Sequence, residues 1–253
     1  MKKSILILAI SCITLSALAW GATGHRVTGH IAYKHLSKKT RLAMQRILGQ
    51  QSLAMAATWM DDVRSDSLYD MYEDWHWVTI EDNETYDQTK KNPKGDIIYA
   101  LERIITELKS KKLSPKEEAE RLKMLIHLIG DIHQPLHVGR ADKGGNDVKL
   151  TWFGSNSNLH TVWDSGMIDG TRLSYTELAE SLYKPSATEV KAWQSTSIRD
   201  WAKESIGYRK QVYDIGNSKL GYEYQYRYFS IVRDRLAQAG VRLAGLLNEI
   251  YGK

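Results

Sequence analysis

The spacing of apolar residues constrains the fold of this chain more than any other feature of its sequence. Along most of its 253 residues, apolar side chains recur at helical spacing, as in the stripe of Ile97, Leu101, Ile104, Ile105 and Leu108. That spacing is typical of helices that bury one face. We therefore expect an all-α fold, with helices over residues 24–36, 37–48, 51–64, 96–109, 115–133, 159–167, 174–183, 188–213 and 222–251.

Local signals refine this prediction. Ser114-Pro115-Lys116-Glu117 is a capping-box start with proline at the first helical position, and the helix that it opens should stop before Pro135. Residues 148–153 alternate between apolar and polar side chains, which predicts one short β ribbon. No internal repeat or Pro/Gly-rich linker divides the chain, so we expect a single mainly helical domain over residues 20–253.

The first residues have the features of a secretory signal peptide. Lys2 and Lys3 precede an apolar run that ends in Ala17-Leu18-Ala19, an A-x-A cleavage site. Cleavage after residues 1–19 would leave a protein that starts at Trp20, is secreted or periplasmic, and has no membrane segment.

The cysteine content and the net charge limit which stabilising bonds, metal ligands and binding partners the protein can have. Cys12 is the only cysteine and leaves with the signal peptide, so we expect no disulfide and no thiolate metal ligand. A lipoprotein cut before Cys12 is the alternative, although Ala9-Ile10-Ser11 matches a lipobox poorly. The net charge of +5, of which Lys2 and Lys3 supply two, is only a weak indication of polyanion binding.

Histidines and aspartates repeat with a spacing that suits a metal site. His127 and Asp131 lie at i and i+4, His160 and Asp164 repeat that spacing, and His137 lies between the pairs. A single such pair is more often a core histidine with a capping aspartate. Two pairs in one chain favour a hydrolytic zinc site, because neutral imidazoles and carboxylates are ligands that zinc accepts.

Further candidates come from other segments. Asp61 is near the end of the third predicted helix, His76 stands in Trp75-His76-Trp77, and His25 opens the first helix.

The whole region after the signal peptide resembles the S1/P1 nuclease family. The segments that carry the resemblance are Trp20-x4-His25, Trp59-Met60-Asp61, the segment around His76, His127-x3-Asp131-x5-His137, Gly144-Gly145-Asn146, His160-x3-Asp164, and residues 201–205 and 239–248. The resemblance implies the fold shared by zinc phospholipase C and P1 nuclease, and it implies three zinc ions as cofactors.

The resemblance also implies how the ligands are divided. One zinc is held by Asp61, His76, His127 and Asp131, and a second by His137, His160 and Asp164. The third is held by His25, by Asp131 as a bridging ligand, and by the free α-amine and carbonyl of Trp20.

The activity implied is hydrolysis of phosphodiester bonds in single-stranded DNA and RNA to 5′-phosphorylated products, with 3′-nucleotidase activity on nucleotides. Arg64, which matches a family arginine proposed to stabilise the charged transition state, is the expected catalytic residue together with the ligand Asp61. Trp77 matches a base-stacking position. The other expected substrate-binding residues are Thr79, Lys143 and Asn146, of which Thr79 and Lys143 depart from the fungal pattern and leave base preference open.

Two other functions remain open at this point. A zinc-dependent phospholipase C would share the fold and nearly the same ligands, although that branch carries glutamate where this chain has Asp164. A secreted zinc-binding protein without catalysis is the other alternative, and Arg64 beside the ligands disfavours it. No stable protein partner is implied.

Overall fold

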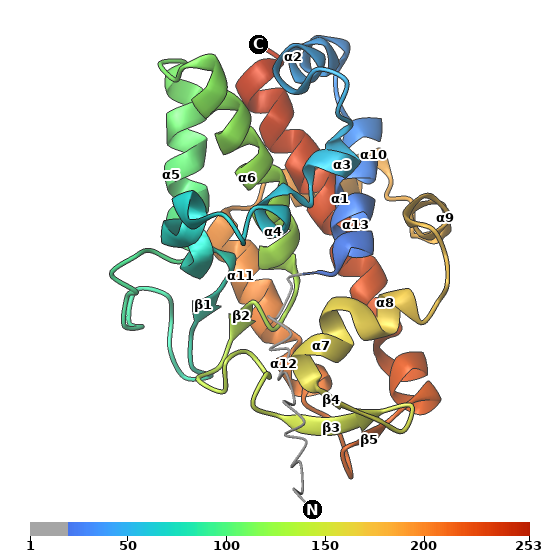
Figure 1. Cartoon of the computed structure of the whole chain (residues 1–253). Coiled ribbons are helices and arrows are strands. Elements are labelled where there is room, and N and C mark those ends of the chain that lie inside the picture. Colours follow the sequence, from blue (N-terminus) through green and yellow to red (C-terminus); the bar gives the residue numbers. More distant parts are fainter. Residues whose placement is uncertain (1–19) are drawn as a thin grey trace, which may run out of the picture.

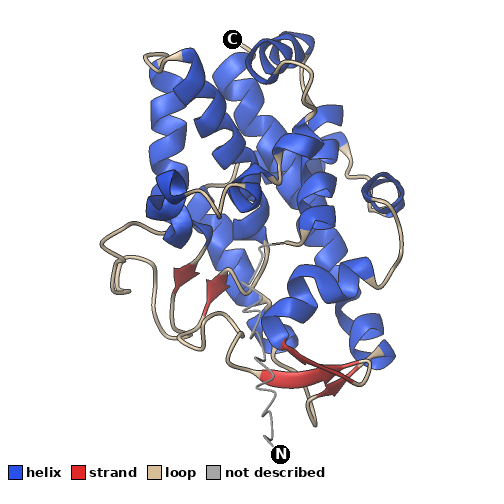
Figure 2. Ribbon diagram, viewed as in Figure 1, coloured by secondary structure: helices blue, strands red, loops and turns tan. Residues whose placement is uncertain are grey.

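The computed structural model describes residues 20–253, so the predicted signal peptide lies outside the described residues. Helices dominate this part of the chain, which confirms the all-α prediction (Figures 1 and 2). None of the helices in residues 20–253 has the length and apolar character needed to cross a membrane. The helices are α1 (Ala22–Lys34), α2 (Lys38–Leu48), α3 (Leu53–Ala56), α4 (Trp59–Asp62), α5 (Ile97–Ser110), α6 (Pro115–His133), α7 (Leu159–Thr161), α8 (Met167–Asp169), α9 (Tyr175–Ser181), α10 (Ala187–Gln194), α11 (Ile198–Gly207), α12 (Arg209–Val212) and α13 (Tyr222–Tyr251), with a 3-10 segment η1 (Ser67–His76) and a π-helical segment η2 (Val162–Gly166).

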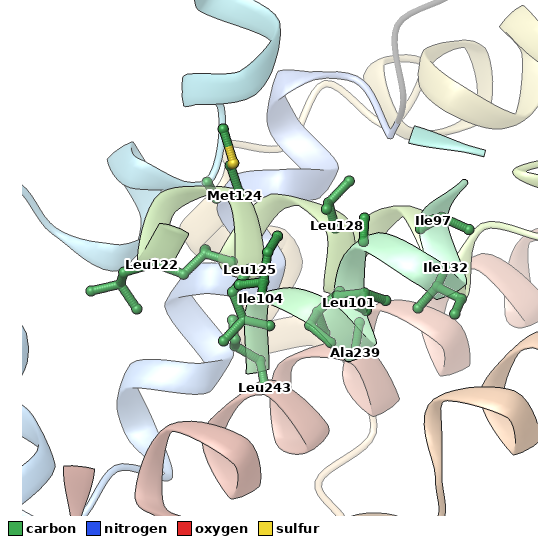
Figure 3. Close-up of a cluster of buried hydrophobic side chains, with 14 of the residues drawn as sticks. Ile97, Leu101, Ile104, Leu122, Met124, Leu125, Leu128, Ile132, Ala239 and Leu243 are labelled. Atoms are coloured by element: carbon green, nitrogen blue, oxygen red, sulfur yellow. The ribbon is translucent and has the colours of Figure 1, made fainter. Parts of the chain in front are cut away.

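Helix α6 is the centre of the larger apolar core. It begins as predicted, with Ser114 and Glu117 forming a capping box and proline in the first turn. Its second half is buried on every side because α1, α5, α11 and α13 all pack against it. Figure 3 shows Leu125 and Leu128 of α6 among Leu101 and Ile104 of α5 and Leu243 of α13.

A second apolar cluster lies at the other end of α13. It joins η2 and α8 to α1 and to the first half of α13, around the fully buried Trp163, Met167, Val232 and Leu236. The 30-residue helix α13 therefore connects both clusters (Figure 1).

The strands in residues 20–253 are short and form two small sheets. The predicted ribbon is present as β3 (Lys149–Trp152) paired with antiparallel β4 (Ser155–Asn158), and β5 (Lys219–Leu220) adds a parallel neighbour to β3. The parallel pair of β1 (Val78–Thr79) and β2 (Val138–Gly139) was not predicted.

Two predicted helices are interrupted. Residues 51–64 form α3 and α4 in place of one helix, because the Ala57 carbonyl accepts a hydrogen bond from the His127 side chain while Asp61 N–H donates to Thr58. Residues 188–213 divide into α10, α11 and α12, with Ser197 capping α11. The segment η1 lies where no helix was predicted.

A buried ionic network holds α6 to α11 and α13. Glu204 of α11 accepts hydrogen bonds from Arg235 and Arg242 of α13, both of which are almost wholly buried. Arg235 also donates to the His133 carbonyl at 3.0 Å, and Arg242 donates to His133 Nε2 at 2.9 Å. Burial lowers the pKa of His133 well below its usual value, so its ring is neutral and accepts.

Glu204→Gln should destabilise the protein, because two buried guanidinium groups would lose the charge that compensates them. Breaking a fully buried pair costs about 3–5 kcal/mol, and the Glu204 side chain is 34% exposed, so we expect a loss of about 2–3 kcal/mol in the free energy of unfolding. Chemical denaturation of both proteins measures this difference in the free energy of unfolding. The matched control is Glu249→Gln, which breaks the exposed pair with Lys109. Equal losses in both variants would contradict the role of the network.

Candidate metal centre

Three groups of histidine and aspartate side chains converge below the surface. Within each group the potential ligand atoms all lie within 4.8 Å of one another. The groups are His25, His127 and Asp131; Asp61, His76 and His127; and His137, His160 and Asp164. They contain all eight side chains that the sequence nominated as histidine or aspartate ligands, and they draw on α1, α4, η1, α6, α7 and η2.

Asp131 links the first two groups. Its Oδ1 lies 3.2 Å from His25 Nε2, whereas its Oδ2 lies 3.0 Å from His76 Nδ1 and 3.3 Å from His127 Nε2. The carboxylate is fully buried. Because its two oxygens face different imidazoles, Asp131 is placed to serve two cations at once.

Backbone carbonyls orient three of the imidazoles. The Nδ1–H groups of His127, His137 and His160 donate to the carbonyls of Ala57, His76 and Gly144, each at 2.7 Å. A histidine held in this way has its Nε2 lone pair available as a ligand. These bonds therefore aim three Nε2 atoms into the clusters.

Several buried polar atoms lack any hydrogen-bond partner in the described chain, and most of them face the clusters. Unpaired buried polar atoms cost free energy unless a cation or water compensates them. Their concentration at the converging side chains fits a divalent metal centre. The cluster atoms, several of which lie within ion-pair distance of one another without forming a hydrogen bond, are His25 Nε2, Asp61 Oδ1, Asp131 Oδ1, His137 Nε2, His160 Nε2 and Asp164 Oδ2.

The ionisation states of Asp131 and His76 also favour a bound cation. Burial opposes the charged form of Asp131, but the neighbouring His127 and His137 hold its pKa well below the usual value. Burial lowers the pKa of His76 to about 4, so this ring is neutral near pH 7 and can act as a ligand. In His137, burial is outweighed by Asp131 and Asp164, which raise its pKa to about 9. A bound metal would displace that proton.

Trp20 is anchored beside the first group. Its indole is fully buried and donates to the Gly130 carbonyl at 2.8 Å, and Gly21 N–H donates to the Asp164 carbonyl at 2.7 Å. A Cβ at position 130 would lie 2.9 Å from His25 Nδ1, so only glycine there lets α1 approach α6 this closely.

Gln134 is a site residue that was not predicted from the sequence. This fully buried side chain donates from Nε2 to Asp164 Oδ1 at 2.6 Å and accepts from Leu136 N–H at 2.5 Å. It therefore orients a carboxylate 30 residues away. The sequence signal was its position between the end of α6 and Pro135.

A pocket of about 820 Å³ opens above the clusters. His76, His137 and His160 reach its lining, as do all the residues nominated for substrate binding, namely Trp77, Thr79, Lys143 and Asn146. Arg64 also lines it, with Nε 3.4 Å from Asp61 Oδ1. The Trp77 side chain is 37% exposed, which excludes it from the core.

Comparison with known proteins agrees with this geometry. Residues 20–252 match the family model described as S1/P1 Nuclease. The chain is 29% identical to Endonuclease 3 of Arabidopsis thaliana over 97% of this chain and 93% of that protein. It is 28% identical to Nuclease S1 of Aspergillus oryzae, covering 96% and 97%, and 29% identical to Nuclease P1 of Penicillium citrinum, covering 92% and 98%. The chain therefore belongs to the S1/P1 nuclease family, whose members are hydrolases that cleave phosphodiester bonds in nucleic acids.

Proposed function

We propose that residues 20–253 form one trinuclear-zinc nuclease domain that hydrolyses single-stranded DNA and RNA to 5′-phosphorylated products and removes 3′-phosphates from nucleotides. The observation that carries this proposal is the convergence of three His/Asp groups, with unpaired buried atoms, beneath a pocket lined by Trp77 and Arg64. The proposed location is secreted or periplasmic, which rests on the signal-peptide pattern of residues 1–19. The partners are the nucleic acid substrates alone.

The proposed zinc ligands follow the three groups. Asp61, His76, His127 and Asp131 would hold one zinc, and His137, His160 and Asp164 a second. His25 and Asp131, with the α-amine and carbonyl of Trp20, would hold the third. Bound zinc supplies a Lewis acid for phosphoryl oxygens and lowers the pKa of water towards about 7.

The chain's own residues position the substrate. Asp61 holds the guanidinium of Arg64 at the pocket wall, where it would stabilise negative charge that develops on the scissile phosphate. The half-exposed Trp77 offers an indole face for a base, while Thr79, Lys143 and Asn146 line the same pocket. A single strand supplies an unstacked base at lower cost than a duplex, which favours single-stranded substrates in a recessed site.

The phospholipase C alternative is not retained. The relatives bear the names of nucleases and endonucleases, and position 164 is aspartate.

The direct test offers purified residues 20–253 single-stranded DNA, RNA, duplex DNA and phosphatidylcholine. We expect hydrolysis of the two single strands, slower cleavage of the duplex and none of the lipid. A chelator should abolish the activity and lower the melting temperature, because zinc ties separate helices together, and added zinc should restore both. Undiminished nuclease activity after complete removal of zinc would contradict the proposal.

A protein that retains Ala19 before Trp20 should lose most of its activity while remaining folded. Its α-amine would become an amide nitrogen, which is not a zinc ligand. Elemental analysis should find less zinc per chain, and the far-UV circular dichroism should be unchanged. The matched control adds one residue after Lys253. Equal zinc content and turnover in both proteins would show that the α-amine is not a zinc ligand.

Trp77→Leu should raise KM for nucleotides and oligonucleotides by roughly 5- to 150-fold, because stacking is worth about 1–3 kcal/mol per base. Its melting temperature and zinc content should change little, since the indole is 37% exposed. Trp163→Leu is the contrasting control, because Trp163 is fully buried and its loss should lower the melting temperature. An unchanged KM in Trp77→Leu would show that this indole does not stack on the base.

A further inference from the structure

Apart from Arg64, the charged side chains that line the pocket outside the metal groups lie on two walls. One wall is η1, which contributes Asp70 and Glu73. The other, here called the β3 wall, comprises Lys143 and Asp147 before β3 and Lys149, the first residue of β3. The segment η1 packs against α5, whereas β3 lies at the end of the molecule away from α5 (Figure 1).

Lys149 carries the uncompensated positive charge of the β3 wall. Its Nζ donates to the Asn146 carbonyl at 2.7 Å, and no carboxylate of residues 20–253 lies within 4.0 Å of it. An ammonium group has three donors, so two remain for a ligand. Lys143 differs, because its Nζ lies 3.1 Å from Asp147 Oδ1 and that charge is offset.

The position of Lys149 relates it to the metal centre. It is the first residue of β3 and pairs with Asn158 at the end of β4. Asn158 also lines the pocket and caps α7, the short helix that carries His160. Lys149 therefore stands on the strand beside the one that delivers a proposed zinc ligand.

The η1 wall has the opposite character. Asp70 and Glu73 are exposed, and neither forms an ion pair with a basic side chain of the described chain. Uncompensated carboxylates repel a phosphodiester backbone. A polyanion that reaches the metal centre thus meets attraction at β3 and repulsion at η1.

We propose that Lys149 binds a phosphate that flanks the scissile one, so that a polynucleotide leaves the pocket across β3 and avoids η1. This inference rests on the proposed nuclease function and assigns Lys149 a role in discriminating polymers from mononucleotides. A 3′-mononucleotide has a single phosphate, which occupies the metal centre, and therefore gains nothing from Lys149.

The test compares Lys149→Gln with the wild type on a thymidylate oligomer and on a 3′-mononucleotide, across a range of salt concentrations. Each phosphate neutralised on a single strand contributes about −0.7 to the slope of log affinity against log salt. We expect kcat/KM for the oligomer to fall and its slope to become less negative by about 0.7, with a change of less than about twofold for the mononucleotide. Fluorescence anisotropy with a phosphorothioate oligomer should show the same change in binding.

Two further variants isolate the charge. Lys149→Arg should retain the salt slope of the wild type, because it keeps the positive charge at this position. Lys219→Gln is the matched control, since Lys219 is exposed on β5 in the same sheet but does not line the pocket. It should leave both substrates unaffected.

Glu73→Gln should have the opposite effect and raise kcat/KM for the oligomer, because it removes a negative charge from the η1 wall. Its control is Glu84→Gln, on an exposed loop outside the pocket, which should leave kcat/KM unchanged. The proposal is overturned if Lys149→Gln matches Lys219→Gln on the oligomer, or if it impairs the mononucleotide equally. A wild-type protein inactive on every nucleic acid would instead overturn the proposed function, and the assignment of Lys149 with it.

Discussion

The buried carboxylate of Asp131 is the constraint on which the rest of the structure depends. It lies within the most apolar stretch of α6, where an uncompensated charge would cost several kcal/mol. Charged His127, one turn earlier on α6, and charged His137 offset that cost, while His25 on α1 and His76 at the end of η1 contact the two carboxylate oxygens. Helix packing must therefore bring these elements to one point, so the apolar core and the His/Asp clusters depend on the same helix contacts.

Close approach to that point requires departures from regular structure. Position 130 must be glycine so that His25 can lie against α6. The helix over residues 51–64 breaks because the carbonyl of Ala57 bonds to the His127 ring, and the break allows Asp61 to point to the same centre. Beyond the end of α6, Gln134 reaches Asp164 and sets the geometry of the third group.

Charged side chains of α11 and α13 also hold the C-terminal end of α6. Glu204 compensates Arg235 and Arg242, and both arginines donate to His133 near the end of the same helix. The His/Asp clusters and this ionic network thus both hold α6, which is the kind of support that a functional site needs. The pocket rim is carried instead by η1 and by the segment before β3, irregular elements on which recognition residues commonly lie.

The sequence alone determined most of the helical elements, although not the interruptions in residues 51–64 and 188–213 or the segment η1, and it identified the cluster side chains. Periodicity and the capping box at Ser114 depend on neighbours along the chain, and so does the i, i+4 spacing of His127 with Asp131. The tertiary structure alone decided where residues 51–64 break, that Gln134 reaches Asp164, and that Lys149 lines the pocket. The physical reason is that each of these features depends on a partner, such as the Ala57 carbonyl or the Asp164 carboxylate, that only folding brings within hydrogen-bonding distance.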